Sequence, residues 1–520
     1  MRSVRYFNTT GPCFEAEHYM LPPEPRLPEA REYIERGFYF VVHAPRQSGK
    51  TTVLETLART LNAEGEYVVV SFSCEQMRTA ETVGDAEAQL LGIIAEAAEN
   101  TELAPEFRPP DPWPETVPGN RLGMALRDWA VRCPLPLVLF FDEIDTLTGD
   151  ILVSVLSQLR TGHRLRSRGK FPHSIVLCGM RDVRDYKAAS GGDPDRLGTS
   201  SPFNIKVDSI RLDDFTHAQV AELYEQHTEA TGQKFSPEAV QRAFEASQGQ
   251  PWLVNALARE VVDKMRVPVS EPVTDGHMDE AVERLIVARA THLDSLVARL
   301  HEPRVKRIVE PMLAGTETTT GPTYDEDLSY VRDLGLIRQS HYIQIANPIY
   351  QEVIARVLTG HVESNINVDP RSFVTPQGRL DFGKCLTEFV DFWRLNGEIL
   401  ARQQTYSEAA CQLVFMGWLH RVVNGGGLID REYAVGSGRI DIFVRWYLPD
   451  RSQQWEAVEL KVRRPGRPDP VTQGLVQLDG YLDRLSLPSG TLVVFDQCSE
   501  LPSITETPSP SGRTIILLRI

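Results

Sequence analysis

Residues Tyr39-Phe-Val-Val-His-Ala-Pro-Arg-Gln-Ser-Gly-Lys-Thr-Thr52 decide the fold of this 520-residue chain. The stretch begins with an apolar run at residues 38–43, passes through a short polar loop, and continues into a segment with helical spacing, residues 51–62. A buried strand, a tight loop and a helix in this order are typical of a parallel sheet with helices on both faces. The sequence therefore predicts an α/β fold that is built outward from this unit.

The loop itself, Ala44-Pro-Arg-Gln-Ser-Gly-Lys-Thr51, matches the spacing of a Walker A phosphate loop, with Ala44 where the first glycine usually stands. In such a loop, backbone N–H groups and the start of the next helix surround phosphate groups, a lysine neutralises their charge, and a threonine holds Mg²⁺. Lys50 and Thr51 are the candidates for the last two roles. The residues expected to contact nucleotide are Ala44, Gln47, Ser48, Gly49, Lys50, Thr51 and Thr52.

A second motif, Leu137-Val-Leu-Phe-Phe-Asp-Glu-Ile-Asp145, is an apolar strand that ends in carboxylates. We expect Asp142 to assist Mg²⁺ and Glu143 to polarise the water that attacks the γ-phosphate. Further strands are expected at residues 67–72 and 174–178, with helices between them. ATP or ADP with Mg²⁺ is therefore the predicted cofactor.

These motifs, with Ile175-Val-Leu-Cys-Gly-Met-Arg181 and Gly249-Gln-Pro251, resemble the STAND class of AAA+-related signalling ATPases, in its archaeal-type group. The resemblance implies that Arg181 senses the γ-phosphate and that Pro251 lies in a helical lid close to the adenine. For Arg181, an ordinary surface arginine is the alternative. A winged helix normally follows, and Ile345-Ala-Asn-Pro-Ile-Tyr350 is similar to its last strand and helix. Proteins of this class act as nucleotide-dependent switches.

The predicted organisation is multidomain, with a parallel-sheet ATPase core and four further parts. The expected boundaries are 1–215 for the core, 216–294 for the helical lid, 295–360 for the winged helix, 361–378 for a linker and 379–520 for an α/β C-terminal domain. The net charge is −16, but residues 371–520 hold 17 basic and 17 acidic residues, so charge does not exclude a nucleic-acid partner for that domain. No apolar run approaches a membrane span, and seven scattered cysteines suit a reducing cytoplasm.

The C-terminal domain contains a second constellation of charged residues on two neighbouring strands. Asp441 lies in the strand Gly438-Arg-Ile-Asp-Ile-Phe-Val444, and Glu459 and Lys461 lie in Trp455-Glu-Ala-Val-Glu-Leu-Lys-Val462. Residues two apart on a strand share a face, so Glu459 and Lys461 point the same way. If Asp441 is on an adjacent strand, two carboxylates and an ammonium meet, which is a set that can hold Mg²⁺ and orient a nucleophile.

This constellation is similar to the core of the PD-(D/E)XK nucleases, with Ile440 in place of the proline. The resemblance implies that Asp441 and Glu459 bind metal and that Lys461 acts with them in catalysis. It adds Glu408, on the preceding helix, as a metal ligand. Three residues are expected to support the site: Arg439, Gln477 and Tyr481, the last two as a Q-x-x-x-Y pair on the following helix.

Three functions are compatible with these patterns. The first is an ATP-gated nuclease that cuts nucleic acid, most simply DNA, in prokaryotic defence against phage or plasmids, with repair or mobile-element processing as rival roles. The second is a nucleotide-dependent regulator or scaffold that binds a partner without cleavage, and it predicts a broken nuclease site. The third, a nucleic-acid motor, lacks a helicase-type motif set. The sequence does not name the trigger or the oligomeric state, although a dimer would suit double-strand cutting.

Overall fold

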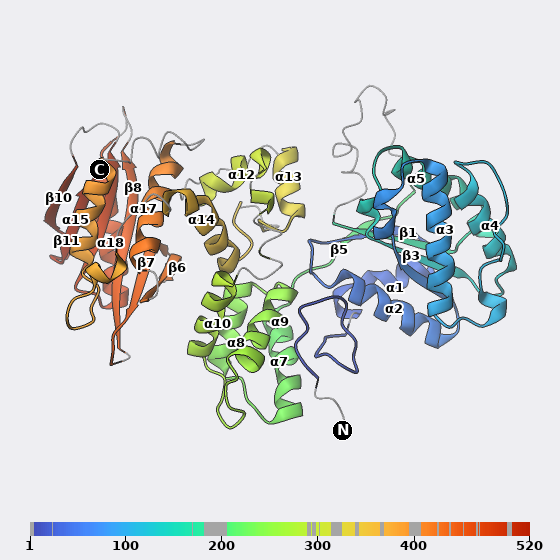
Figure 1. The fold of residues 1–520 in the computed structure, drawn as a ribbon, viewed down its shortest axis with the longest axis horizontal. Helices are drawn as coiled ribbons and strands as arrows, with labels where there is room; N and C mark the ends of the chain where they lie inside the picture. The colour runs from blue at the N-terminus through green and yellow to red at the C-terminus, as the bar shows by residue number, and fades with distance from the viewer. Residues whose placement is uncertain are drawn as a thin grey trace. The chain divides into compact units, whose positions relative to one another are not determined.

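The structure is a computed structural model that describes residues 5–22, 24–168, 170–180, 205–288, 293, 298–300, 302–313, 325–338, 343–363, 369–394, 407–423, 426–435, 438–450, 452–463, 466, 468–496 and 502–520. They form two units, Met1–Leu285 with Asp333–Gly335, and Ile286–Arg332 with Leu336–Ile520. Figure 1 shows the elements of both units. Within these described ranges, no helix is both long and apolar enough to cross a bilayer.

The first unit contains a five-stranded parallel sheet with the order β2-β3-β4-β1-β5. Its strands are β1 (Tyr39–His43), β2 (Val68–Ser73), β3 (Leu137–Asp142), β4 (Ser174–Gly179) and β5 (Ser209–Arg211). The first four agree with the predicted strands to within one residue at either end. The three-residue strand β5 was not predicted, because so short a segment carries no periodicity.

Helices cover both faces of this sheet, as predicted. Tyr39 and Val41 pack with α3 (Val83–Asn100), α4 (Arg121–Arg132) and α5 (Gly149–His163). Phe40 and Val42 point to the opposite face and pack with α1 (Pro28–Glu35) and α2 (Lys50–Glu64). The two groups of helices can be followed in Figure 1. Every residue of β3 and β4 is buried, which is normal for central strands of a parallel sheet.

The segment after β5 is helical, as its spacing predicts. It contains α7 (His217–Thr231), α8 (Pro237–Ser247), α9 (Pro251–Arg259), a π-helical turn η6 (Glu260–Lys264) and α10 (Asp275–Val287). A capping box starts α7, in which Thr216 and Gln219 exchange hydrogen bonds. The N-terminal segment, residues 5–22, packs on these helices through Phe7, which contacts Tyr19 and Tyr224. The sequence did not indicate this contact.

The second unit begins with helices and ends in a six-stranded mixed sheet of order β10-β11-β9-β8-β7-β6. Its helices include α12 (Pro303–Leu313), α13 (Glu326–Asp333), α14 (Pro348–Glu363), α15 (Phe382–Phe392), α17 (Ser407–Val423) and α18 (Val471–Leu485). The strands are β6 (Gly427–Val435), β7 (Gly438–Tyr447), β8 (Gln453–Arg463), β9 (Ser489–Asp496), β10 (Ser503–Pro508) and β11 (Thr514–Arg519).

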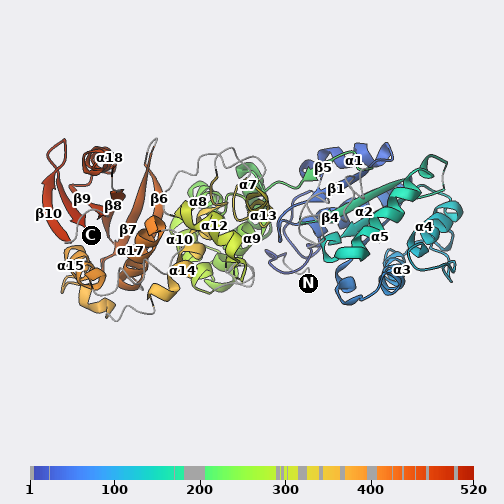
Figure 2. The ribbon, with the colours of Figure 1, turned by 90° about the horizontal axis from the view of Figure 1, so that it is seen from above.

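This sheet is covered on both faces. Figure 2 shows α18 on one face and α15 with α17 on the other. Leu478 and Leu482 of α18 are fully buried against Ala457 of β8 and Leu492 of β9. Strands β7 and β8 and helix α18 agree with the prediction, whereas β6, β10 and β11 were missed. The identities of the lid, the winged helix and the nuclease domain stay predictions.

Candidate functional site

The predicted phosphate loop connects β1 to α2 at the C-terminal edge of the first sheet. Its backbone turns through two left-handed residues, Gln47 with φ 58° and Gly49 with φ 85°, and α2 then begins at Lys50. Only glycine adopts the second of these conformations without a steric cost. The loop therefore aims the start of α2 at the space above the strand ends, where an anion is stabilised.

Lys50 and Thr51 lie where the sequence predicts. Lys50 Nζ donates to Ala44 O and Pro45 O, both at 2.8 Å, so the ammonium lies across the loop. Thr51 Oγ1 donates to Asp142 Oδ2 at 2.6 Å, and Asp142 is only 3% exposed. A hydroxyl and a carboxylate oxygen in contact form the hard-oxygen set that Mg²⁺ prefers. The two predicted Mg²⁺ ligands of this site thus fit the ion.

Glu143, the predicted base, follows β3 in a left-handed conformation with φ 54°. Its Oε2 accepts a hydrogen bond from Ser73 Oγ at 2.8 Å. Burial raises the pKa of the Glu143 carboxyl, while the bond from Ser73 opposes that rise. Ser73 belongs to neither motif, although its place at the end of β2, paired with Asp142 at the end of β3, was a usable signal.

The other residues predicted to contact nucleotide include Thr52, Pro251 and Arg181. Thr52 Oγ1 accepts from the Cys13 N–H at 3.0 Å, so this hydroxyl holds the N-terminal segment. Pro251 is buried in the first turn of α9, and the preceding Gln250 donates through Nε2 to Gln47 O at 3.4 Å. The phosphate loop and the Gly-x-Pro segment are therefore in contact. Arg181 lies outside the described residues.

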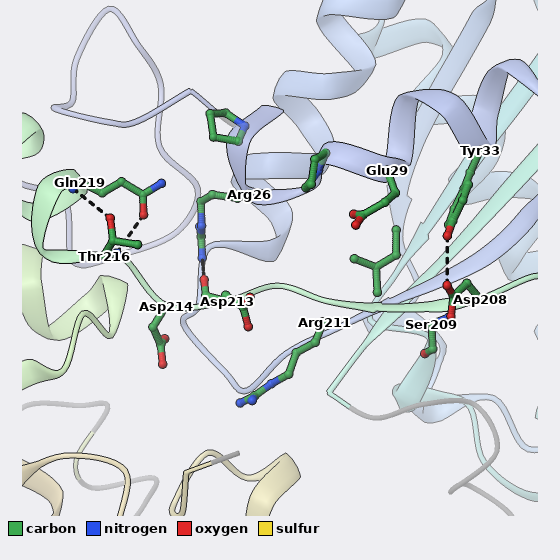
Figure 3. A pocket seen from close by; sticks show the side chains of 13 residues that line it. Arg26, Glu29, Tyr33, Asp208, Ser209, Arg211, Asp213, Asp214, Thr216 and Gln219 are labelled. Carbon is green, nitrogen blue, oxygen red and sulfur yellow. Dashed lines mark hydrogen bonds between the residues drawn. The ribbon is translucent and has the colours of Figure 1, made fainter. Parts of the chain in front are cut away.

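A polar cavity of about 440 Å³ is lined by residues within 25–33 and 208–219 (Figure 3). Arg26, from the 3-10 turn η1 (Glu24–Arg26), forms part of its wall and donates to Ser48 O in the loop. On the opposite wall, Tyr33 Oη donates to Asp208 Oδ2 at 3.0 Å. Arg26 lies outside every motif, so no sequence pattern indicated it.

The C-terminal constellation is assembled as predicted on neighbouring strands. Asp441 of β7 accepts through Oδ2 from the Leu460 N–H of β8 at 2.7 Å. Lys461 Nζ is 2.5 Å from Glu459 Oε1. Glu459 has no exposed surface, and its second oxygen, Oε2, is buried with no hydrogen-bond partner in the described part of the chain. Burial, together with the Asp441 charge, raises the pKa of Glu459 to about 7.

A bound cation would fit two features of the Asp441–Glu459 pair. It would supply the partner that Glu459 Oε2 lacks and would offset the repulsion between two carboxylates. Among the described residues, no cluster of three or more His, Cys, Asp or Glu residues is arranged to hold a metal. Of the predicted metal ligands in this domain, Asp441 and Glu459 are therefore the two whose side chains can be placed. Glu408 is on α17 and Arg439 is on β7, but their side chains lie outside the described part.

The supporting residues on α18 face the same region. Gln477 Nε2 donates to Tyr481 Oη at 3.1 Å, which shows the predicted Q-x-x-x-Y residues in contact. Gly474, one turn earlier, brings the helix close to the sheet: a Cβ there would lie 3.4 Å from Lys461 Cγ. Arg463, two residues beyond Lys461, is paired with Asp496 at 3.0 Å. The charge of Arg463 is therefore already balanced inside the protein.

Comparison with known proteins gives a family match for the N-terminal two thirds of the chain. A family model described as an AAA-like domain matches residues 14–352. No curated protein sequence matches the chain. Among solved structures, the chain is similar to a Walker-type ATPase of Pyrococcus abyssi, at 14% identity and a TM-score of 0.47, over 67% of this chain and 99% of that one.

Two further solved structures are similar at a lower level. One is the RuvB Holliday junction branch migration motor of Thermotoga maritima, at 14% identity and a TM-score of 0.34, over 64% of this chain and 93% of that one. The other is the Orc1 protein of Aeropyrum pernix in complex with DNA, at 15% identity and a TM-score of 0.33, over 65% and 93%. Similarities this low decide nothing about function.

Proposed function

The chain belongs to the AAA-like domain family and is a P-loop ATPase, and from that premise we propose that it is an ATP-hydrolysing switch that controls a Mg²⁺-dependent nuclease in its own C-terminal domain. The proposed substrate is nucleic acid, in the first place DNA, and the proposed role is prokaryotic defence against phage or plasmids. The STAND-type switch, an unidentified trigger and self-association are parts of the same proposal.

In the proposed ATPase site, each polar group at the ends of the strands has a role in binding or hydrolysing ATP. Lys50 and the N–H groups of the loop bind the phosphates, and Thr51 with Asp142 would hold Mg²⁺, which supplies charge neutralisation on the phosphate oxygens. Glu143 accepts the proton of the attacking water or orients that water. Its Oε2 accepts a hydrogen bond from Ser73 Oγ, which orients the carboxylate.

The nuclease half is carried by one observation, the partnerless Oε2 of Glu459 beside Asp441. A buried carboxylate oxygen without a hydrogen-bond partner costs free energy, and a metal ion bound at Oε2 would offset that cost. Asp441 and Glu459 would hold Mg²⁺, whose chemistry is to lower the pKa of bound water and to stabilise charge on the phosphate. Lys461, held at Glu459, orients the nucleophile.

The order of elements around this pair agrees with the proposal. Helix α17, strands β6, β7 and β8, helix α18 and strand β9 follow one another, with Asp441 on β7, Glu459 and Lys461 on β8, and the Gln477–Tyr481 pair on α18. The PD-(D/E)XK resemblance expects this sequence of acid, E-x-K strand and Q-x-x-x-Y helix.

The helix in which the AAA-like match ends packs on the C-terminal domain within the second unit, and this packing supports control of that domain by nucleotide. The AAA-like match ends at residue 352, inside α14, and α14 packs along α17 of the C-terminal domain. Glu352 Oε1 accepts from Arg356 Nε at 2.7 Å and lies 3.0 Å from His420 Nε2 of α17. The side chains of Glu352 and His420 are only 11% and 10% exposed. Because α17 also carries Glu408, movement of α14 reaches the helix of a proposed metal ligand.

The alternative is a regulator or scaffold whose C-terminal domain binds a partner without cleavage. That reading explains the ATPase family and the packing of α14 on α17 equally well. It gives no reason for a buried Glu459 with a partnerless oxygen next to Asp441 and Lys461. The nuclease is therefore the better supported function.

The test is plasmid cleavage by the full chain with Mg²⁺, with and without ATP. Wild type is compared with Asp441→Ala, Glu459→Gln and Lys50→Ala. Glu456→Gln is the matched control, because Glu456 is on the same strand as Glu459, is not exposed, and bonds to Gln454. We expect Asp441→Ala and Glu459→Gln to abolish cutting, Glu456→Gln to retain it, and Lys50→Ala to remove its dependence on ATP.

A measurement of metal binding distinguishes two reasons for a lack of cleavage, an absent trigger and an absent metal site. If no plasmid, oligonucleotide or RNA is cut, Mn²⁺ binding is measured by titration calorimetry on wild type and Asp441→Ala. Binding that depends on Asp441 retains the nuclease site. Absence of any Asp441-dependent binding would establish the scaffold reading in its place.

A further inference from the structure

Arg26 joins the phosphate loop to the segment that leads from the first sheet into α7. A single guanidinium nitrogen, Nη2, donates to Ser48 O at 2.9 Å and to Asp213 O at 2.6 Å. The guanidinium also lies over the ring of Phe215, with Cζ 4.9 Å from the ring centroid. Figure 3 shows the side chain extended towards Asp213 along the cavity wall. The Arg26 guanidinium therefore connects the turn η1, the phosphate loop and the segment of residues 213–215.

The bond to Ser48 fixes the direction of a peptide group inside the phosphate loop. A trans peptide is planar, and its C=O and N–H groups point in opposite directions. Because Arg26 holds the Ser48 carbonyl, the Gly49 N–H points away from Arg26. A Cβ on Gly49 would lie 3.1 Å from Arg26 Nη1, so the guanidinium is in close contact with this peptide. An N–H that faces the inside of such a loop is a donor for a phosphate oxygen.

The bond to Asp213 connects the same cation to the segment of residues 212–215. Leu212 N–H donates to His43 O at 3.0 Å, at the end of β1, and Phe215 N–H donates to Gly249 O at 2.8 Å. Gly249 precedes Gln250, whose side chain reaches Gln47 O in the phosphate loop. A displacement of either the loop or the 212–215 segment therefore changes the bonds of Arg26.

The charge of Arg26 is retained although its surroundings are unfavourable. Burial lowers the pKa of Arg26 to about 10, and Asp214 and Asp213 oppose this decrease. The guanidinium is thus still protonated at neutral pH. Its Nε is buried without a hydrogen-bond partner in the described part of the chain. Hydrogen bonds from a charged donor are stronger than those between neutral groups, so the two bonds from Nη2 constrain both carbonyls.

We infer that Arg26 is a positioning residue for nucleotide binding, which orients the phosphate loop and links that orientation to the segment leading into α7, α8 and α9. This inference rests on nucleotide binding at residues 44–51. Arg26 touches no reacting atom in this scheme and acts through Ser48 and Asp213 alone.

The test is titration calorimetry of ATP and ADP with Mg²⁺ on the full chain, for wild type, Arg26→Gln and Arg26→Lys. The matched control is Arg31→Gln, since Arg31 is on α1 and forms an exposed pair with Glu64 at 2.6 Å. We expect Arg26→Gln to weaken both nucleotides by about tenfold or more, as for a lost hydrogen bond from a charged group. Arg26→Lys, whose ammonium ends one bond short of the position of Nη2 and has no planar group to lie over Phe215, should be intermediate, and Arg31→Gln unchanged.

Steady-state hydrolysis gives a second readout that a purely structural role would not produce. In Arg26→Lys, KM for ATP should rise by a larger factor than kcat falls, because the reacting groups are intact. Wild-type affinity in a folded Arg26→Lys protein would overturn the inference, and this variant decides the matter if Arg26→Gln does not fold. A wild type that binds no nucleotide would instead refute the ATP site itself.

Discussion

Ser73 controls the ionisation and position of Glu143, and its loss should change the pH dependence of ATP hydrolysis. The Ser73 hydrogen bond lowers the pKa of a carboxyl that burial raises. A general base works only when ionised, so activity falls as pH falls through its pKa. In Ser73→Ala the pKa of Glu143 rises further, and the acid limb of the kcat profile should move to higher pH.

The measurement for this prediction is kcat for ATP against pH, with Ser71→Ala as the control on the same strand and face of β2. Glu143→Gln should lower kcat by about a hundredfold or more at all pH values. An acid limb in Ser73→Ala that coincides with the limb of wild type would show that Ser73 does not act on the base.

Glu459 should destabilise the metal-free protein at high pH. Its pKa is about 7 when folded against 4.5 for an ordinary glutamate, so the folded state holds a proton that the unfolded state has lost between these values. Stability therefore decreases as pH rises from about 4.5 to about 7. In EDTA, Glu459→Gln should be more stable than wild type at pH 8, by up to about 3 kcal/mol, and equal to it near pH 4.5.

Calorimetric unfolding at both pH values, with and without Mg²⁺, measures this effect. Mg²⁺ should stabilise wild type at pH 8 and leave Glu459→Gln unchanged, since binding to the folded state alone raises stability. The control is Glu506→Gln, at an exposed glutamate of β10. A Glu459→Gln protein that is less stable than wild type at pH 8 would contradict the prediction.

At the scale of elements, Gly249 determines how closely α9 approaches the end of the sheet. Its φ is 79°, and a Cβ would lie 1.8 Å from Phe215 O, which is a backbone atom that cannot move aside alone. Gly249→Ala should therefore lower stability by about 2 kcal/mol or more and weaken ATP binding. Gly232→Ala, at the end of α7 with φ 84° and open space around it, isolates the cost of the backbone angle, about 1 kcal/mol. Equal melting temperatures for the two variants would exclude the contact as the cause.

Elements with strong periodicity or a complete motif were predictable from the sequence, and the others were not. Strands β1 to β4 are apolar runs bounded by helices, and Thr51 and Asp142 belong to motifs whose chemistry requires their contact. Strand β5 has three residues and β10 is mostly exposed, so neither shows the pattern of a buried strand. Arg26 and Ser73 act through contacts between segments far apart in the chain, which no local pattern reveals.

At the scale of the whole molecule, the chain runs from the AAA-like region into the C-terminal domain through α14, which packs along α17 within the second unit. Glu352 is the last residue that the family model matches. Its side chain is buried, and its Oε1 atom contacts both Arg356 Nε and His420 Nε2. Glu352→Gln or His420→Ala weakens this contact between α14 and α17, which should loosen their packing more than it changes either domain. We expect Glu352→Gln and His420→Ala to reduce the ratio of cleavage with ATP to cleavage without it by about fivefold or more, while metal binding at Asp441 persists.

The control for this contact is Glu388→Gln, which removes an exposed pair with Lys384 on α15 in the same domain. Cleavage and ATP hydrolysis are measured in parallel on each variant, because coupling is the property that should change. If a variant hydrolyses ATP at the wild-type rate but its cleavage no longer responds to ATP, the contact between α14 and α17 carries the coupling. An unchanged ratio in both Glu352→Gln and His420→Ala would mean that the nucleotide state reaches the nuclease by another route, and the packed helices would then only hold the two domains together.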